Sequence, residues 1–123
     1  PGVHLKEKRL QEHIEQPGNL QMSVSTHSLK SIQTSLDIGA SFCVFGPVYP
    51  PMSKNSKAVG TDELQRMTLQ SPQNILALGG LTPERVGPCI QAGAKGVACI
   101  SSVMLSHQPA QTIQAFMKAM QNK

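Results

Sequence analysis

The sequence predicts an α/β protein in which five parallel strands alternate with helices, all within one domain covering residues 1–123. Five short apolar segments recur at intervals of about 20 to 30 residues, the separation that parallel strands need for a crossover helix. Helical periodicity fills the intervals between these segments. Two of the predicted strands end in small residues, Gly79-Gly80 and Ser101-Ser102, which leave room for a ligand near the backbone.

The first two strand–helix pairs are predicted within residues 3–39. A strand at residues 3–5 precedes a charged helical segment at residues 6–16, and a second strand covers residues 22–26. The following helix begins at Leu29, where Ser28 or His27 can cap its N-terminus, and Gly39 ends it.

The third strand, at residues 42–45, is apolar throughout, which is typical of a parallel strand covered on both faces. After a long polar loop, Thr61 is predicted to cap the next helix. A fourth strand at residues 75–78 leads to a helix starting at Thr82, and a fifth at residues 97–100 precedes a last helix opened by Pro109. That helix is expected to turn four side chains inward: Ile113, Phe116, Met117 and Met120.

Composition narrows the possible partners. The chain has a formal charge of +4 and a pI near 9.2, but its densest basic cluster, residues 6–9, is interrupted by Glu7 and no stripe of basic and aromatic residues follows. We therefore expect anionic small molecules as ligands and no nucleic acid. No apolar run approaches the roughly 20 residues of a membrane span, so no membrane association is expected.

The three cysteines, Cys43, Cys89 and Cys99, are far apart in the sequence and form no CxxC motif. An odd number of well-separated cysteines favours buried free thiols in a reducing cytoplasm, which predicts a cytoplasmic protein. Neither these cysteines nor the four histidines have the spacing of a zinc site.

Five strand–helix pairs suit either a small open doubly wound sheet or the last five-eighths of a (β/α)8 TIM barrel. The pairs Gly79-Gly80 and Ser101-Ser102 favour the barrel, because TIM barrels commonly bind phosphate with the loops after their last two strands and a short extra helix. Residues 101–106 have the length for such a helix. The sequence thus predicts a TIM-barrel segment.

A series of motifs over nearly the whole chain resembles the thiamine phosphate synthase and TenI superfamily. The motifs, in order, are Gly2-Val3-His4-Leu5, Ser25-Thr26-His27-Ser28, Gly39-Ala40, Phe45-Gly46-Pro47-Val48-Tyr49-Pro50, Lys54, Ala77-Leu78-Gly79-Gly80-Leu81-Thr82-Pro83 and Ala92-Gly93-Ala94-x-Gly96-Val97-Ala98. The resemblance implies a TIM barrel of which this chain covers the fourth strand to the last helix and lacks the first three strands.

The resemblance also implies a reaction. Synthases of this family join hydroxymethylpyrimidine pyrophosphate to thiazole phosphate with Mg²⁺, and both substrates are phosphorylated small molecules. Positive charge and backbone donors must stabilise the departing pyrophosphate. The residues implied are Lys54 and Ser25 as catalytic residues, Ser53 and Lys54 at the pyrophosphate, and Gly79, Gly80, Ile100 and Ser101 at the thiazole phosphate.

Several residues depart from the family pattern. After Gly-Val-His-Leu the family usually has Gly-Gln-Glu/Asp-Asp, whose acid binds Mg²⁺, whereas this chain has Lys6-Glu7-Lys8-Arg9, leaving Glu7 as the nearby candidate ligand. Pro51 stands where the synthases have a Thr. Pro47 aligns with a histidine of the TenI thiazole tautomerases, and proline cannot transfer a proton.

Three hypotheses therefore remain open from the sequence. The chain is an active synthase segment, a tautomerase of the TenI type, or a domain that binds a phosphorylated ligand without turning it over, as in the rear domain of a longer Nudix-type protein. Because five βα units leave two unpaired sheet edges, we expect either the missing N-terminal strands or self-association to cover them.

Overall fold

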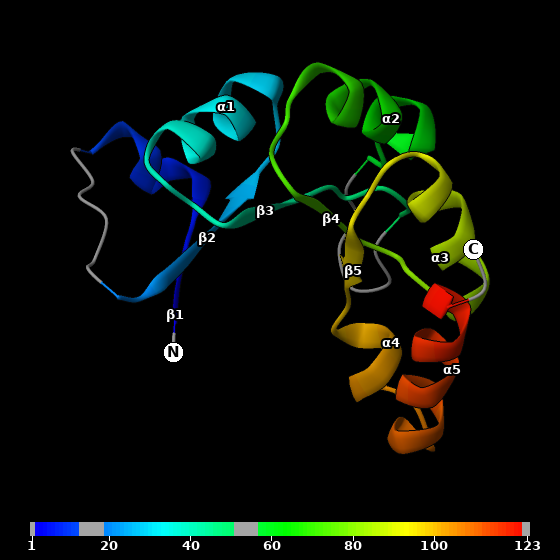
Figure 1. Ribbon diagram of the computed structural model, residues 1–123. Coiled ribbons are helices and arrows are strands. Elements are labelled where there is room, and N and C mark those ends of the chain that lie inside the picture. The colour runs from blue at the N-terminus through cyan, green and yellow to red at the C-terminus, as the bar shows by residue number, and fades with distance from the viewer. Residues whose placement is uncertain (1, 13–18, 51–56, 122–123) are drawn as a thin grey trace.

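The computed structural model describes residues 2–12, 19–50 and 57–121, and it contains one sheet of five parallel strands (Figure 1). The strands are β1 (Gly2–Leu5), β2 (Gln21–Thr26), β3 (Phe42–Phe45), β4 (Ile75–Leu78) and β5 (Gly96–Ala98). The helices are the 3-10 helix η1 (Glu7–Gln11) and the α-helices α1 (Leu29–Asp37), α2 (Gly60–Gln70), α3 (Pro83–Gln91), α4 (Ser101–Met104) and α5 (Pro109–Gln121).

The strands lie in the order β1-β2-β3-β4-β5, so each strand pairs with the next one along the chain. In a doubly wound sheet the order of the strands reverses at a switch point, whereas in a barrel each strand lies beside the next one along the chain. Figure 1 shows the sheet as an arc, with β1 and β5 at its two ends and helices α1, α2 and α3 along its outside. The prediction of a TIM-barrel-like α/β fold is confirmed.

The core lies between the sheet and these helices. Alternate strand residues point outward to the helices, and among them Val24, Cys43 and Ala77 are fully buried. The helices contribute further buried side chains, which are Ile32, Leu64, Met67, Val86, Cys89 and Phe116. A smaller cluster of Met22, Val24 and Ala40 packs with Leu10 of η1, so Leu10 anchors this charged segment to the sheet.

The opposite face of the sheet, on the inside of the arc, changes character along the strand order. On β1 and β2 it is polar, because the His4 ring lies between two serines, with Nδ1 2.7 Å from Ser23 Oγ and Nε2 2.7 Å from Ser25 Oγ. On β3 and β4 it is apolar and includes Phe42 and Val44. Strand β3 is apolar in every residue because both of its faces carry apolar contacts.

The helix starts confirm one expectation and correct another. Ser28 is the N-cap of α1 and forms a capping box with Ser31, so Ser28 rather than His27 caps this helix. Thr61 does not cap α2, which begins at Gly60 with Val59 in the cap position. The loop after β3 sets this start, because the Val59 N–H donates to the carbonyl of Pro47.

The C-terminal part differs from the prediction in two ways. Strand β5 ends at Ala98, so Ile100 precedes α4 and is 70% exposed instead of lying in the strand. On α5, Phe116 is buried and Met120 packs on the core, but Ile113 and Met117 are exposed. Helix α5 packs against α3, and Phe116 and Met120, four residues apart on one face, are among the residues that reach the core. Ile113 lies nearer the N-terminal end of α5, and Met117 lies beside the packed face.

The structure also bears on the helix expected after β1 and on the expectation about membrane-spanning segments. The segment after β1 forms the 3-10 helix Glu7–Gln11 rather than the start of an α-helix, and residues 13–18 lie outside the described residues. Among the described helices, none combines the length and the hydropathy needed to cross a membrane.

Candidate functional site

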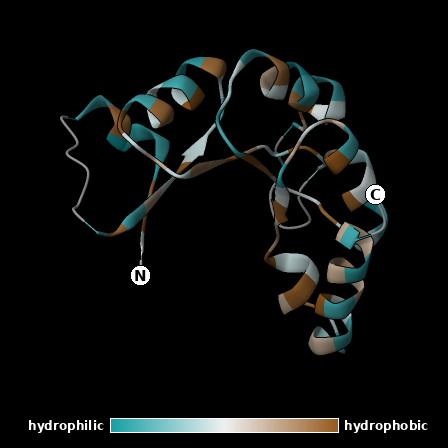
Figure 2. Cartoon of the chain, in the orientation of Figure 1, coloured by the Kyte–Doolittle hydropathy of each residue, from teal (hydrophilic) through white to brown (hydrophobic). Residues whose placement is uncertain are grey.

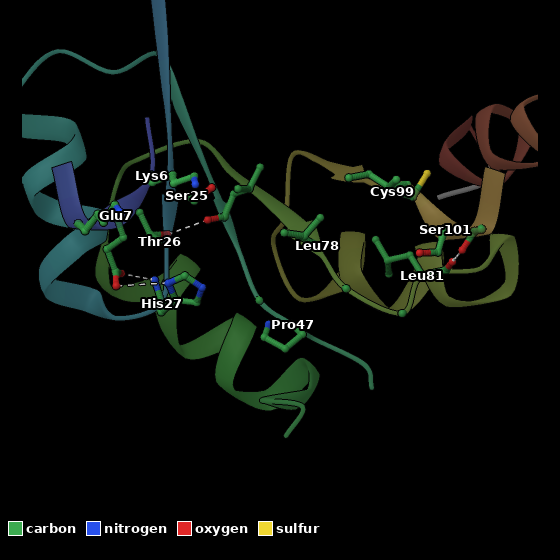
Figure 3. Close-up of a pocket in the computed structure, with 17 residues that line it drawn as sticks. Lys6, Glu7, Ser25, Thr26, His27, Pro47, Leu78, Leu81, Cys99 and Ser101 are labelled. Atoms are coloured by element: carbon green, nitrogen blue, oxygen red, sulfur yellow. Dashed lines mark hydrogen bonds and ion pairs between the residues drawn. The ribbon is translucent and has the colours of Figure 1, made fainter. Parts of the chain in front are cut away.

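A cavity of ≈ 610 Å³ lies at the carboxyl ends of the strands (Figure 3). Segments that follow all five strands contribute to its wall. The lining residues are Lys6, Glu7, Lys8, Ser25, Thr26, His27, Val44, Gly46, Pro47, Leu78, Gly79, Gly80, Leu81, Cys99, Ile100, Ser101 and Ser102. In parallel α/β folds this end of the sheet is where ligands bind.

The glycines Gly79 and Gly80 form one part of the wall, after β4. Both have positive φ, 105° and 63° respectively, a conformation that side chains with a Cβ rarely adopt. A Cβ on Gly79 would lie 2.6 Å from Pro47 Cα, and one on Gly80 would lie 2.5 Å from the Pro50 carbonyl oxygen. These two positions require glycine because of the turn after β4 and because this turn packs closely on the loop after β3. As a consequence, the backbone of Gly79 and Gly80 is exposed to the cavity.

The next part of the wall is the start of α4, directly after β5. The first N–H groups of a helix have no acceptor within the helix, so those of Ser101 and Ser102 are available to an anion in the cavity. The Ser102 hydroxyl donates to the carbonyl of Leu81, which ties α4 to the loop after β4. The structure therefore places the two predicted phosphate loops side by side and supplies the short extra helix expected between residues 101 and 106.

The side chain of Arg85 and the residue Tyr49 stabilise the loop after β4. Arg85 Nη1 donates a 2.7 Å hydrogen bond to the carbonyl of Gly80, and its guanidinium lies 4.7 Å from the centre of the Tyr49 ring. The Tyr49 N–H in turn donates to the carbonyl of Gly79. Because these contacts occupy the carbonyl groups of both glycines, the loop conformation is fixed without any ligand.

The side of the cavity formed by β1 and β2 is charged. Lys6, Glu7 and Lys8 come from the segment after β1, and His27 follows β2. Glu7 Oε2 accepts a 2.6 Å hydrogen bond from the His27 backbone N–H, and Glu7 Oε1 lies 3.3 Å from His27 Nδ1 (Figure 3). Both carboxylate oxygens of Glu7 are therefore directed to His27, at the beginning of α1.

Burial by itself would raise the pKa of Glu7. Hydrogen bonds from the Ser31 hydroxyl and the His27 N–H, with the charge of the His27 ring, outweigh that effect and leave the pKa of Glu7 below its ordinary value. Glu7 is thus ionised at neutral pH and stabilises the turn between β2 and α1.

Ser25, a catalytic residue implied by the resemblance, lines the cavity beside this charged side, and its hydroxyl lies 2.7 Å from His4 Nε2. The network of Ser23, His4 and Ser25 was not foreseen. Strand periodicity provides a signal for it, because residues 23 and 25 share a face and a polar pair there needs a partner on the neighbouring strand.

The remaining predicted residues divide into two groups. Gly79, Gly80, Ile100 and Ser101 all line the cavity, whereas Ser53 and Lys54 lie outside the described residues, as does Pro51. Pro47, which aligns with the tautomerase histidine, also lines the cavity. The contributions of Lys6, Lys8 and Cys99 to the wall were missed, and burial raises the pKa of the Cys99 thiol, which disfavours a thiolate there.

The described residues do not fit a Mg²⁺ site. Within residues 2–12, 19–50 and 57–121, no three His, Cys, Asp or Glu side chains come together. Mg²⁺ in enzymes usually takes one or two carboxylates together with substrate phosphates. Glu7 is the one carboxylate among the described cavity residues, and its oxygens are directed to His27 while lysines stand on either side of it in the sequence.

Fold and cavity together define a class: a parallel α/β barrel segment whose ligand site lies at the carboxyl ends of its strands. The chain belongs to the thiamine monophosphate synthase family, whose model matches residues 1–103. It is 33% identical over 109 residues to a thiamine-phosphate synthase of Bacillus licheniformis, a match covering 85% of this chain and 48% of that protein. It is 30% identical over 128 residues to a thiamine-phosphate synthase of Geobacillus kaustophilus, covering 96% and 56% respectively. The chain thus spans about half the length of these relatives.

Solved structures agree on the fold. A thiamine phosphate pyrophosphorylase from Pyrococcus furiosus superposes with a TM-score of 0.81 at 21% identity, over 98% of this chain and 59% of that one. A 3-hexulose-6-phosphate synthase superposes with a TM-score of 0.64 at 16% identity, over 83% of this chain and 50% of that one. At such identities the likeness is one of fold.

Proposed function

We propose that this chain forms the C-terminal part of a thiamine phosphate synthase, which couples hydroxymethylpyrimidine pyrophosphate with thiazole phosphate to give thiamine phosphate and pyrophosphate. The observation that carries the proposal is the cavity at the carboxyl ends of all five strands. One side of it has glycine and serine backbone groups suited to a phosphate, and the other has lysines suited to a second anion. A reaction between two phosphorylated substrates needs two such places.

The two sides would divide the work. Backbone N–H groups of Ser101 and its neighbours, beside Gly79 and Gly80, would hold the phosphate of the thiazole. Ser25, with Ser53 and Lys54 from the segment after β3, would hold the pyrophosphate as it departs. Groups that are fixed before the reaction stabilise developing charge without reorganising, and the His4 hydrogen bond fixes the Ser25 hydroxyl in this way.

Mg²⁺ is expected from the family, but the described residues do not supply its ligands. A metal-binding carboxylate would have to come from residues other than those described. We further propose that the protein is cytoplasmic, in keeping with its free thiols Cys43, Cys89 and Cys99.

The test is product formation. The purified protein is incubated with both substrates and Mg²⁺, thiamine phosphate is measured by chromatography, and the same gene is introduced into a thiamine auxotroph. We expect product and growth, and we expect Lys54→Ala to abolish both while Lys95→Ala, at the amino end of β5, leaves them unchanged. No product together with no growth would overturn the enzymatic proposal.

A second candidate is a domain that binds a phosphorylated ligand without converting it. It is favoured by Lys6-Glu7-Lys8-Arg9, which stands where the family usually has its metal-binding acid. This candidate predicts ligand binding in the same cavity with no thiamine phosphate formed. The assay above separates the two, because both require binding and only the synthase requires product.

A further inference from the structure

We propose that the β1–β2 side of the cavity binds a phosphate or pyrophosphate group through the ammonium groups of Lys6 and Lys8, without a metal ion held by this chain. The inference rests on the proposed function, since it concerns how the same cavity holds its phosphorylated ligand. It assigns anion binding to two lysines and a positioning role to Glu7.

The first argument concerns Glu7. A carboxylate that binds a metal ion must direct an oxygen lone pair into the ligand space. Here one oxygen accepts the His27 N–H at 2.6 Å and the other lies 3.3 Å from the His27 ring, so the carboxylate is committed to the turn that precedes α1. Breaking these contacts to bind Mg²⁺ would leave the His27 N–H with only its longer 3.2 Å hydrogen bond to the Ser31 hydroxyl oxygen. Glu7 therefore serves the chain itself, by holding the turn after β2.

The second argument concerns charge. Lys6 and Lys8 both line the cavity, on either side of Glu7 in the sequence. In the view of Figure 3, Lys6 and Ser25 are on one side of the cavity, and Leu81 and Ser101 are on the other. With two lysines and one carboxylate, this part of the cavity wall carries a net positive charge, which favours an anion and disfavours a divalent cation. A lysine ammonium is a compact point charge with three donors, which suits phosphate oxygens that approach from several directions.

The third argument is the position of these lysines in the fold. Lys6 directly follows β1, and Lys8 lies within η1, whose Leu10 packs against the sheet. The 3-10 helix thus fixes the direction in which the backbone leaves β1, and both lysine side chains begin at the carboxyl end of that strand. This is the end at which all five segments meet around the cavity.

The experiment measures binding of inorganic pyrophosphate to the purified protein by calorimetry, once in EDTA and once in Mg²⁺, with the second corrected for magnesium pyrophosphate in solution. We expect the dissociation constant in EDTA to stay within about threefold of that in Mg²⁺. The double variant Lys6→Ala/Lys8→Ala should bind at least about tenfold more weakly, because a charged hydrogen bond contributes about that factor. Lys95→Ala removes one positive charge at the opposite end of the sheet and should change binding less than about twofold.

Glu7→Gln provides the sharpest comparison. Glutamine keeps an oxygen that can accept the His27 N–H but removes a negative charge from the cavity wall. The proposal predicts that pyrophosphate binds this variant as tightly as the wild type or more tightly, in EDTA and in Mg²⁺ alike. A metal ligand at Glu7 predicts the reverse, a loss of binding confined to the Mg²⁺ condition. Far-UV circular dichroism verifies that each variant is folded.

Three outcomes would overturn the inference: binding that requires Mg²⁺, binding that is lost in Glu7→Gln, or no pyrophosphate binding under either condition. These outcomes are distinguishable from failure of the proposed function. Thiamine phosphate formed by a protein that binds pyrophosphate only with Mg²⁺ would refute the inference alone. Tight metal-independent binding without product would refute the synthase alone.

Discussion

Adding one methyl group to Gly79 tests how tightly the loops at the cavity are built. In Gly79→Ala the new Cβ would lie 2.6 Å from the Cα of Pro47, and the residue would keep a φ of 105°. Positive φ of this kind costs a residue with a Cβ about 1–3 kcal/mol. Forcing a methyl group into a packed site costs a further 1–3 kcal/mol or so. We therefore expect the variant to lose about 2–6 kcal/mol of unfolding free energy.

Two other glycines separate these contributions. At Gly60, φ is 84° and a Cβ would meet nothing within 4 Å, so Gly60→Ala should lose only the conformational part, about 1–3 kcal/mol. At Gly87, inside α3, a Cβ also meets nothing within 4 Å and φ is not positive. There the gain in helix preference is offset by the constraint that Pro88 places on the residue before it, so Gly87→Ala should change stability by less than about 0.5 kcal/mol.

The assay is urea unfolding followed by far-UV circular dichroism at one protein concentration, since the chain has no tryptophan. With a slope of about 2 kcal/mol per M, Gly79→Ala should lower the midpoint by about 1–3 M. Equal midpoints for Gly79→Ala and Gly60→Ala would refute the steric argument. A Gly79→Ala midpoint equal to that of Gly87→Ala would refute the conformational argument as well.

Three further predictions concern ionisation, thiol reactivity and association. Because the pKa of Glu7 is lowered in the folded chain, its contribution to stability is present above its unfolded pKa, near 4.5, and is lost as pH falls through the folded value. The difference in unfolding free energy between the wild type and Glu7→Ala, about 1 kcal/mol at pH 7, should therefore shrink at pH 3.5. An unchanged difference would contradict this. With a thiol reagent at pH 8, half-buried Cys99 should react first. Burial raises the pKa of Cys89 to about 11, so Cys89 should react only on unfolding. Mass spectrometry identifies the labelled cysteine, and early labelling of Cys89 would contradict this prediction. Light scattering should give a mass above 13.2 kDa that falls on dilution, because β1 and β5 each pair with a strand on one side only in the described sheet. A compact monomer that unfolds cooperatively would refute this expectation.

The association expected of this chain is supported by its surface. Apolar side chains are exposed near β5, on α4 and on α5, namely Ile100, Met104, Leu105, Ile113 and Met117. Figure 2 shows hydrophobic segments on α4 and α5 at this end of the arc. In a closed barrel the last helix packs against the first one, so we propose that these residues meet either the remaining strand–helix units of a barrel or a second copy of the chain.

Local patterns in the sequence were sufficient for the elements and their order. Apolar segments at parallel-strand spacing predicted five strands, and the structure has them at nearly the same residues. Hydroxyl and proline signals located the starts of α1 and α3, because helix capping is a short-range interaction between neighbours in the chain. The cap of α2 was missed because its start depends on the distant loop after β3, where the Pro47 carbonyl accepts the Val59 N–H.

The sequence by itself also indicated the family, and it indicated Gly79, Gly80 and Ser101 as parts of one site. Each of these residues belongs to a short motif of consecutive residues, which can be read without the fold. Only the tertiary structure decided how residues far apart in the chain share the cavity. It directed Glu7 to His27, joined His4 to Ser23 and Ser25, and brought Lys6 and Lys8 to the same wall. Such contacts depend on strand register and on the direction in which each strand ends, and a local pattern carries no record of either.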